Sequence, residues 1–238
     1  MLQVKNISKS FKENSDVLLN ISFSIRPGTV CGIFGDSGAG KSALLMIIAG
    51  RYKEDEGAVY YKHRIVRKGY WHKPKDITYI GDDNRSFSFV SGRKYLEYFA
   101  RKNKISLKSL EESKRWFAEC FGEKSIEQPI CSYSNEMKTV LFFLGAVSCK
   151  PKVFALDEPF MGMTQKNRMI FEKLLIREKE RGSIILIASR EMDQREKLYT
   201  KILFMKMGMI LKEQDIDSDA GYLEMKKVYD NVGKEDFD

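Results

Sequence analysis

The fold is decided by residues 35–42, which read Gly35-Asp36-Ser37-Gly38-Ala39-Gly40-Lys41-Ser42 and fit the pattern G-x-x-x-x-G-K-[ST]. The residues just before them, 29–34, are a short apolar run typical of a strand inside a parallel sheet. The residues just after them continue from Ser42 through Ala43 and predict a helix that ends near Gly50. A chance match in a Gly/Ser turn would lack this context, so the pattern predicts a loop that wraps phosphate groups.

Each residue type in this loop has a chemical reason. Glycines let the backbone bend so that several N–H groups point at phosphate oxygens, and the following helix adds its positive N-terminal end. Lys41 is expected to reach the β- and γ-phosphates, and the Ser42 hydroxyl is expected to bind Mg²⁺. The sequence therefore predicts a nucleoside triphosphate site in which all eight residues take part.

A second apolar run, residues 153–156, ends in Asp157-Glu158-Pro159. Acidic residues at the carboxyl end of a buried strand lie where open α/β sheets bind their ligands. Asp157 can hold the hydration shell of Mg²⁺, and Glu158 can polarise an attacking water. The alternative, an ordinary acidic junction between a strand and a loop, is disfavoured by the phosphate loop upstream.

The remaining pattern indicates an α/β fold. A further apolar run at 184–187 is typical of a central parallel strand, and a charged amphipathic helix is expected at 167–181. Runs at 58–61 and 77–80 predict further strands. Ile21, Phe23 and Ile25 alternate with polar residues, which predicts a half-buried strand in a smaller antiparallel sheet.

The C-terminal half adds helices and a hairpin. Residues 91–148 are mostly helical in pattern with a polar hinge at 103–108, and 202–205 with 209–211 predict a closing hairpin. We therefore predict a phosphate-loop NTPase (RecA-like) fold, with a parallel-sheet core, a small antiparallel β subdomain and an inserted helical subdomain. The expected division is an ATP-binding domain at 1–212, with the helical insertion at about 91–148, and an acidic tail at 213–238.

Charge and hydropathy exclude several classes. The net charge is +8, and residues 212–238 contain nine acids against four lysines, so the positive charge lies in the rest of the chain. No aromatic-basic motif indicates nucleic-acid binding, although a basic body can attract an anionic membrane leaflet. The longest apolar run, Thr139–Cys149, is shorter than the roughly 20 residues of a membrane span, and no secretory signal begins the chain. The four cysteines form neither a zinc pattern nor a disulfide framework.

With these motifs in place, a third segment narrows the family. Residues Tyr133-Ser134-Asn135-Glu136-Met137-Lys138 precede Asp157 by some twenty residues, where ATP-binding cassettes carry a Leu-Ser-Gly-Gly-Gln signature. From about residue 2 to 213 the chain resembles the ATP-binding subunit of an ABC (ATP-binding cassette) transporter. The continuation of the acidic strand end as Pro159-Phe160-Met161-Gly162 is similar to cassettes of drug and bacteriocin exporters.

The resemblance implies roles and partners. Lys41 and Glu158 would be catalytic, and Phe11 would stack on adenine, although a plain core aromatic is the alternative. Asp82 and Ser134 would also contact the nucleotide. The partners would be a separate transmembrane permease subunit and a second ATP-binding subunit, either a copy of this chain or a different cassette. The chain would then lie peripherally on the cytoplasmic face of the cell membrane and bind no nucleic acid.

Four positions depart from the family pattern. Glu136 replaces a signature glycine, Asp82 (or Asp83) replaces a glutamine, Thr164 replaces an aspartate, and Arg190 replaces a histidine. A carboxylate at 136 would repel a triphosphate, whereas Arg190 can bind the γ-phosphate as a fixed charge. We therefore expect an ATPase that binds ATP well but hydrolyses it slowly when paired with itself. Pairing with a different cassette is the alternative.

Other readings remain open at this stage. The aromatic residues 87, 89, 95, 98 and 99 would either contact the membrane subunit or form the core of the helical insertion. A nucleotide-gated regulatory subunit with little hydrolysis, a soluble ABC protein acting on ribosomes or DNA, and a phosphate-loop kinase are the alternative functions. Export is expected from the family association of Met137 and Phe160 alone.

Overall fold

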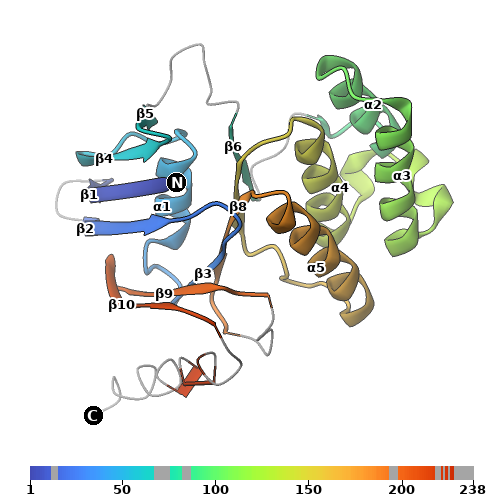
Figure 1. The fold of residues 1–238 in the computed structure, drawn as a ribbon. Helices are drawn as coiled ribbons and strands as arrows, with labels where there is room; N and C mark the ends of the chain where they lie inside the picture. The colour runs from blue at the N-terminus through green and yellow to red at the C-terminus, as the bar shows by residue number, and fades with distance from the viewer. Residues whose placement is uncertain are drawn as a thin grey trace. The chain divides into compact units, whose positions relative to one another are not determined.

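The computed structural model describes residues 1–11, 16–66, 76–81, 87–192 and 198–217, together with 221, 223, 224, 226 and 227. The chain divides into two compact units, which are described separately (Figure 1). The first unit consists of residues 1–79, 152–158 and 178–238, and the second of residues 80–151 and 159–177.

The first unit contains two β-sheets. The antiparallel sheet has the order β2-β1-β4-β5, and the larger sheet has the order β10-β9-β3-β8-β7-β6. The strands are β1 (Leu2–Ser10), β2 (Asp16–Ile25), β3 (Val30–Phe34), β4 (Glu56–Tyr61), β5 (Arg64–Val66), β6 (Ile77–Ile80), β7 (Val153–Asp157), β8 (Ile184–Ser189), β9 (Lys201–Lys206) and β10 (Met209–Asp215). The strand pairs β3–β8, β3–β9 and β7–β8 are parallel, as the apolar runs predict, and β9–β10 is the expected hairpin.

Burial explains why these residues form these strands. Every residue of β3 is buried, which suits a strand with neighbours on both edges and side chains covered on both faces. In β2 the buried residues Ile21, Phe23 and Ile25 alternate with exposed serines, so only one face meets the core. The helix α1 (Lys41–Ile48) contacts strands of both sheets, and its apolar residues join one continuous core with them.

The strand β1 has no simple alternation in the sequence. Leu2 and Val4 face the core, but the next buried residue is Ile7, because the pairing with β2 shifts register between Val4 and Ile7. Asn6 within this irregularity has a φ of 50°. A bulge of this kind moves the inward face from even to odd positions, which hides the strand from a period-two pattern. At the other end of the chain, β10 continues to Asp215, beyond the domain end predicted at 212.

The second unit is helical and comes between β6 and β7 in the chain. Its helices are α2 (Gly92–Lys102), α3 (Leu107–Phe121), α4 (Asn135–Ser148) and most of α5 (Gln165–Glu180), with short 3₁₀ turns η2 (Glu123–Glu127) and η3 (Ile130–Ser132). A serine caps each of the first three helices by accepting a hydrogen bond from a backbone N–H three residues on, and these serines are Ser91, Ser106 and Ser134. No helix in the described part of the chain is long and apolar enough to cross a membrane.

The aromatic residues of this unit divide between its interior and its surface. Phe87 packs against Tyr95, Tyr98 and Phe99, with ring centroids 5.1, 5.7 and 6.0 Å away. Phe89, by contrast, is 93% exposed. The cluster around Phe87 therefore belongs to the packing of the helical unit, whereas Phe89 is a surface residue.

Candidate functional site

The phosphate loop is shaped by close backbone approaches. Gly35 has a φ of 156°, and a Cβ there would overlap the carbonyl oxygen of Met205 in β9. Gly40 caps α1 with a φ of 95°, and a Cβ there would overlap the carbonyl oxygen of Val17 in β2. Both positions therefore require glycine, and the loop is held between the last part of the larger sheet and the antiparallel sheet.

Lys41 is the buried cation of this loop. Its side chain is 5% exposed, and its Nζ donates hydrogen bonds to the carbonyl oxygens of Gly35 at 2.6 Å and Asp36 at 2.8 Å. Burial lowers the pKa of Lys41, while the nearby carboxylates of Glu158 and Asp157 act in the opposite direction. Ser42 is exposed in the first turn of α1, so its hydroxyl is accessible beside the loop.

The acidic strand end carries the residue pair that the sequence predicts. Asp157, the last residue of β7, accepts a hydrogen bond at Oδ2 from the Tyr79 hydroxyl at 2.9 Å. Its other oxygen, Oδ1, is buried and has no hydrogen-bond partner among the described residues. A buried carboxylate oxygen that lacks a donor is costly unless a ligand satisfies it, and oxygen is the ligand type that Mg²⁺ prefers. Asp157 and Ser42 thus fit a magnesium ion.

Glu158 lies beside Arg190, an arrangement that the sequence did not predict. Glu158 has a φ of 46°, and its N–H donates to the carbonyl oxygen of Ala188 at 2.9 Å, which fixes the turn after β7. Its carboxylate accepts a hydrogen bond from Ser189 Oγ at 3.3 Å and pairs with Arg190 Nε at 3.5 Å. Because Ser189 and Arg190 end the neighbouring strand β8, parallel pairing brings them next to Glu158.

Phe11, the predicted adenine-stacking residue, lies at the end of β1 and is 47% exposed. Its ring meets Tyr52 edge-on with centroids 5.3 Å apart, and the Lys9 ammonium lies 5.4 Å from the ring centroid. Tyr52 is an aromatic neighbour that sequence reasoning missed, because 41 positions separate it from Phe11 and no motif includes it. The stacking itself stays a prediction.

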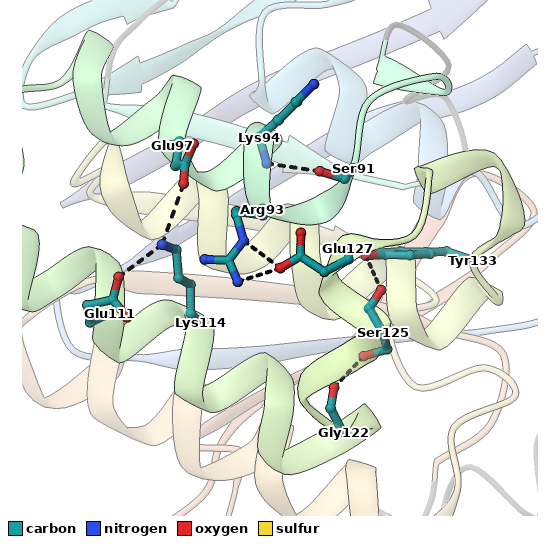
Figure 2. A network of polar contacts seen from close by, with 10 residues as sticks. All are labelled: Ser91, Arg93, Lys94, Glu97, Glu111, Lys114, Gly122, Ser125, Glu127 and Tyr133. Atoms are coloured by element: carbon teal, nitrogen blue, oxygen red, sulfur yellow. Dashed lines mark hydrogen bonds and ion pairs between the residues drawn. The ribbon is translucent and has the colours of Figure 1, made fainter.

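In the second unit, the signature segment is anchored by Tyr133. Figure 2 shows its hydroxyl donating to the backbone carbonyl of Ser125, at 2.8 Å, and the ring also stacks on Phe117 with centroids 5.5 Å apart. Burial raises the pKa of Tyr133 to about 12. The next residue, Ser134, begins α4 and accepts a hydrogen bond from the N–H of Met137 at 3.3 Å. The signature serine therefore starts a helix whose entry is fixed by a buried tyrosine.

Ion pairs brace the same unit from its surface. Arg93 of α2 pairs with Glu127 of η2, and Lys114 of α3 lies 2.9 Å from Glu111 and 3.5 Å from Glu97 (Figure 2). Exposed pairs of this kind contribute about 1 kcal/mol or less each. Their effect here is to connect α2, α3 and the η2 turn that holds Tyr133.

Glu136, which replaces the signature glycine, is bound within its own unit. Its Oε2 accepts hydrogen bonds from the N–H of Thr164 at 3.1 Å and from Asn167 Nδ2 at 3.2 Å. Asn167 is 5% exposed, and Thr164 accepts a hydrogen bond from the Asn167 N–H at 3.4 Å at the start of α5. Two of the four departures from the family pattern, Glu136 and Thr164, are therefore in contact with each other.

The structure thus places the predicted residues in two groups. The first unit carries Phe11, the loop 35–42, Asp157, Glu158 and Arg190, and the second unit carries Ser134. Asp82 and the alternative Asp83 lie outside the described residues, so their predicted contact with the nucleotide stays a prediction.

Comparison with known proteins identifies the family. The family model for ABC transporters matches residues 18–161, more than half of the chain, so the chain belongs to the ABC transporter family. Its domain is accordingly an ABC-type ATP-binding and ATPase domain, as the motifs predict.

Two curated relatives illustrate the range of this family. The uncharacterized ABC transporter ATP-binding protein YhcH of Bacillus subtilis (strain 168) is 28% identical over 230 residues, 93% of this chain and 74% of that protein. The ribose import ATP-binding protein RbsA of Caldanaerobacter subterraneus subsp. tengcongensis is 26% identical over 227 residues, 91% of this chain and 45% of that protein. Importers are therefore among the proteins that this chain resembles.

Solved structures share the fold. One described as the ATP-binding subunit of an ABC transporter has a TM-score of 0.83 at 20% identity, covering 98% of this chain and 100% of that chain. A dimeric ATP-binding cassette in a post-hydrolysis state, bound to ADP and phosphate, has a TM-score of 0.77 at 18% identity, covering 92% of this chain and 100% of that chain. The predicted phosphate-loop NTPase fold is confirmed.

Proposed function

We propose that this chain is the ATP-binding subunit that energises a transporter through MgATP-driven pairing of two cassettes, followed by hydrolysis. The observation that carries the proposal is the grouping of charges in the first unit. Asp157, Glu158 and Arg190 are all close enough to Lys41 to act on its pKa. A phosphate loop, a metal-binding carboxylate and a candidate base in one place are the parts that phosphoryl transfer to water requires.

Each residue has a role in this proposal. The backbone of residues 35–42 and the N-terminus of α1 bind the phosphates, and Lys41 exchanges its carbonyl partners for phosphate oxygens. Ser42 and Asp157 would hold Mg²⁺, which when bound neutralises charge on the β- and γ-phosphates. Glu158 orients and deprotonates the attacking water, and Phe11 stacks on the adenine. Ser134 would contact the nucleotide of a second cassette, and Asp82 would contact its own.

Slow hydrolysis follows from the pairing of Glu158. A base must be free to accept a proton, and the Glu158 carboxylate is shared with Ser189 and Arg190. Arginine stays protonated, so Arg190 can hold a γ-phosphate but cannot relay a proton near neutral pH. We infer that turnover requires Arg190 to leave Glu158 for the phosphate.

The partner is proposed to be a separate transmembrane permease subunit, with the chain peripheral on the cytoplasmic face of the membrane. The exposed Phe89 supports a contact surface on the helical unit, because a large aromatic at 93% exposure is costly in water. The second cassette is either a copy of this chain or a different one. Residues 1–212 with the insertion at about 91–148 are proposed as the ATP-binding domain, and 213–238 as a tail.

Export is the proposed direction, supported by the Asp157–Gly162 segment that resembles exporter cassettes. The alternative, a nucleotide-gated regulatory subunit, is favoured by the same Glu158–Arg190 pair, which would suit ATP binding without turnover.

Two measurements test the proposal. The purified chain should bind a fluorescent ATP analogue in the presence of Mg²⁺, and Lys41→Ala should abolish this binding without lowering the melting temperature by more than a few degrees. A tagged chain isolated from gently solubilised host membranes should carry a polytopic membrane protein in near-stoichiometric amount. Recovery without any membrane protein would refute the transporter role. Binding in the full complex without ATP turnover would establish the regulatory alternative.

A further inference from the structure

Tyr79 distinguishes the two oxygens of the Asp157 carboxylate. Its hydroxyl donates to Oδ2 at 2.9 Å, whereas Oδ1 is buried and has no hydrogen-bond partner among the residues that the structure describes. Tyr79 itself is 6% exposed, so water does not compete freely for its hydroxyl. One oxygen is thereby fixed by the protein and the other is left for a ligand.

The Tyr79 ring is held from two sides of the first unit. It belongs to β6, which neighbours β7 in the larger sheet, and the carbonyl oxygen of Asp76 accepts hydrogen bonds from Lys152 and Val153 at 2.7 and 2.8 Å. On the other side, the Arg51 guanidinium lies 4.5 Å from the centroid of the ring. Such a cation–π contact contributes about 0.5–2 kcal/mol when partly desolvated.

Arg51 connects this tyrosine to the phosphate loop. Its N–H donates to the carbonyl oxygen of Met46 at 2.8 Å, directly after the end of α1. The helix that begins with Lys41 and Ser42 therefore ends against the tyrosine that holds Asp157. Both proposed metal-binding side chains, Ser42 and Asp157, are referred to one another through α1, Arg51 and Tyr79.

We propose that Tyr79 is a positioning residue for Mg²⁺, one that aims Oδ1 of Asp157 at the ion without touching the ion or the nucleotide. The inference rests on the proposed function, in which Asp157 and Ser42 hold the metal. Without the hydroxyl, Oδ2 loses its donor and the carboxylate can turn about its terminal torsion, which is broad for aspartate. Partners that orient a metal ligand typically change metal affinity by about 10-fold to 100-fold.

The test separates metal positioning from nucleotide binding. Tyr79→Phe removes only the hydroxyl, and Tyr61→Phe, at a buried tyrosine of β4 in the antiparallel sheet, is the matched control. Binding of a fluorescent ATP analogue to the full chain is titrated with Mg²⁺, and separately measured in EDTA. We expect Tyr79→Phe to need about 10-fold more Mg²⁺ for half-maximal binding, with unchanged affinity in EDTA. Tyr61→Phe should match the unaltered chain.

A second readout uses Mn²⁺, whose binding with the nucleotide is followed by electron paramagnetic resonance. Tyr79→Phe should weaken Mn²⁺ binding, and Arg51→Gln should weaken it less, because the hydroxyl contact remains. The inference is overturned if Tyr79→Phe titrates like the unaltered chain, or if it loses nucleotide affinity equally with and without the metal. If the unaltered chain shows no Mg²⁺-dependent binding, the proposed function fails, and the inference fails with it.

Discussion

Replacing Glu136 by glutamine and, separately, by glycine distinguishes two roles for this side chain. If the carboxylate repels the triphosphate of a second cassette, both changes remove the charge and both should raise ATP hydrolysis. The contacts to Thr164 and Asn167 predict a different order. Glutamine keeps an oxygen that can accept both hydrogen bonds, whereas glycine removes both and leaves the buried Asn167 amide without this partner.

The magnitudes follow from these contacts. A hydrogen bond to a charged acceptor contributes about 1.5–3 kcal/mol and a neutral one about 0.5–1.5 kcal/mol, so Glu136→Gln should cost about 1 kcal/mol in this partly exposed setting. Glu136→Gly leaves a buried amide unsatisfied, at about 1–3 kcal/mol, and adds about 1 kcal/mol for glycine in a helix. The expected loss is about 3 kcal/mol, or roughly 8 °C in melting temperature for a chain of this size.

The assay is thermal unfolding of the purified chain together with ATP hydrolysis in the complex. We expect the unaltered chain to be most stable, then Glu136→Gln, then Glu136→Gly, with no gain in hydrolysis for either. Asn167→Leu is the matched partner, because it removes one end of the same contact and should add little to the loss in Glu136→Gly. A glycine variant that melts like the unaltered chain and hydrolyses ATP faster would refute this reasoning in favour of charge repulsion.

Further changes test the site and its surroundings. Glu158→Gln should lower ATP hydrolysis by about 100-fold to 10,000-fold and leave binding of the ATP analogue intact; equal hydrolysis would remove Glu158 from the catalytic role. Phe89→Asp should release the membrane partner and spare both stability and ATP binding, whereas Phe87→Asp should also lower the melting temperature, because Phe87 packs within an aromatic cluster. Because the pKa of Tyr133 rises from 10.0 to about 12 on folding, the neutral phenol is favoured in the folded chain. Its contribution to stability is complete below about pH 10 and is lost as the pH rises towards 12. Urea unfolding at pH 9 and pH 11 should therefore show a smaller decline for Tyr133→Phe.

The central sheet and the phosphate loop could be predicted because their information is local. The strands β3, β7 and β8 are continuous apolar runs, and the loop is a motif whose glycines are required by the backbone itself. The strand β1 was missed because its register shift breaks the alternation on which a strand prediction depends.

The side-chain contacts of the site could not be predicted. Tyr79 and Asp157 are 78 positions apart, and Glu136 and Thr164 are 28 positions apart, so no spacing rule connects them. Such pairs are created by strand order and helix packing, which the pattern fixes only as a class. The sequence therefore indicated which residues depart from the family but not that Glu136 and Thr164 bind each other.

The order in which this chain is synthesised differs from the order in which its phosphate loop can form. The strand β3 pairs with β8 and β9, whose residues, such as Ile185 and Lys201, follow it by more than 150 positions, and Gly35 is pressed against Met205. At about 5–20 residues per second, a ribosome needs on the order of 10–30 s to supply these neighbours. The nascent loop therefore emerges early with its sheet unmade and becomes able to grip a nucleotide only when synthesis is nearly complete. A short β9 segment late in the chain thus acts as the trigger that prevents premature ATP capture.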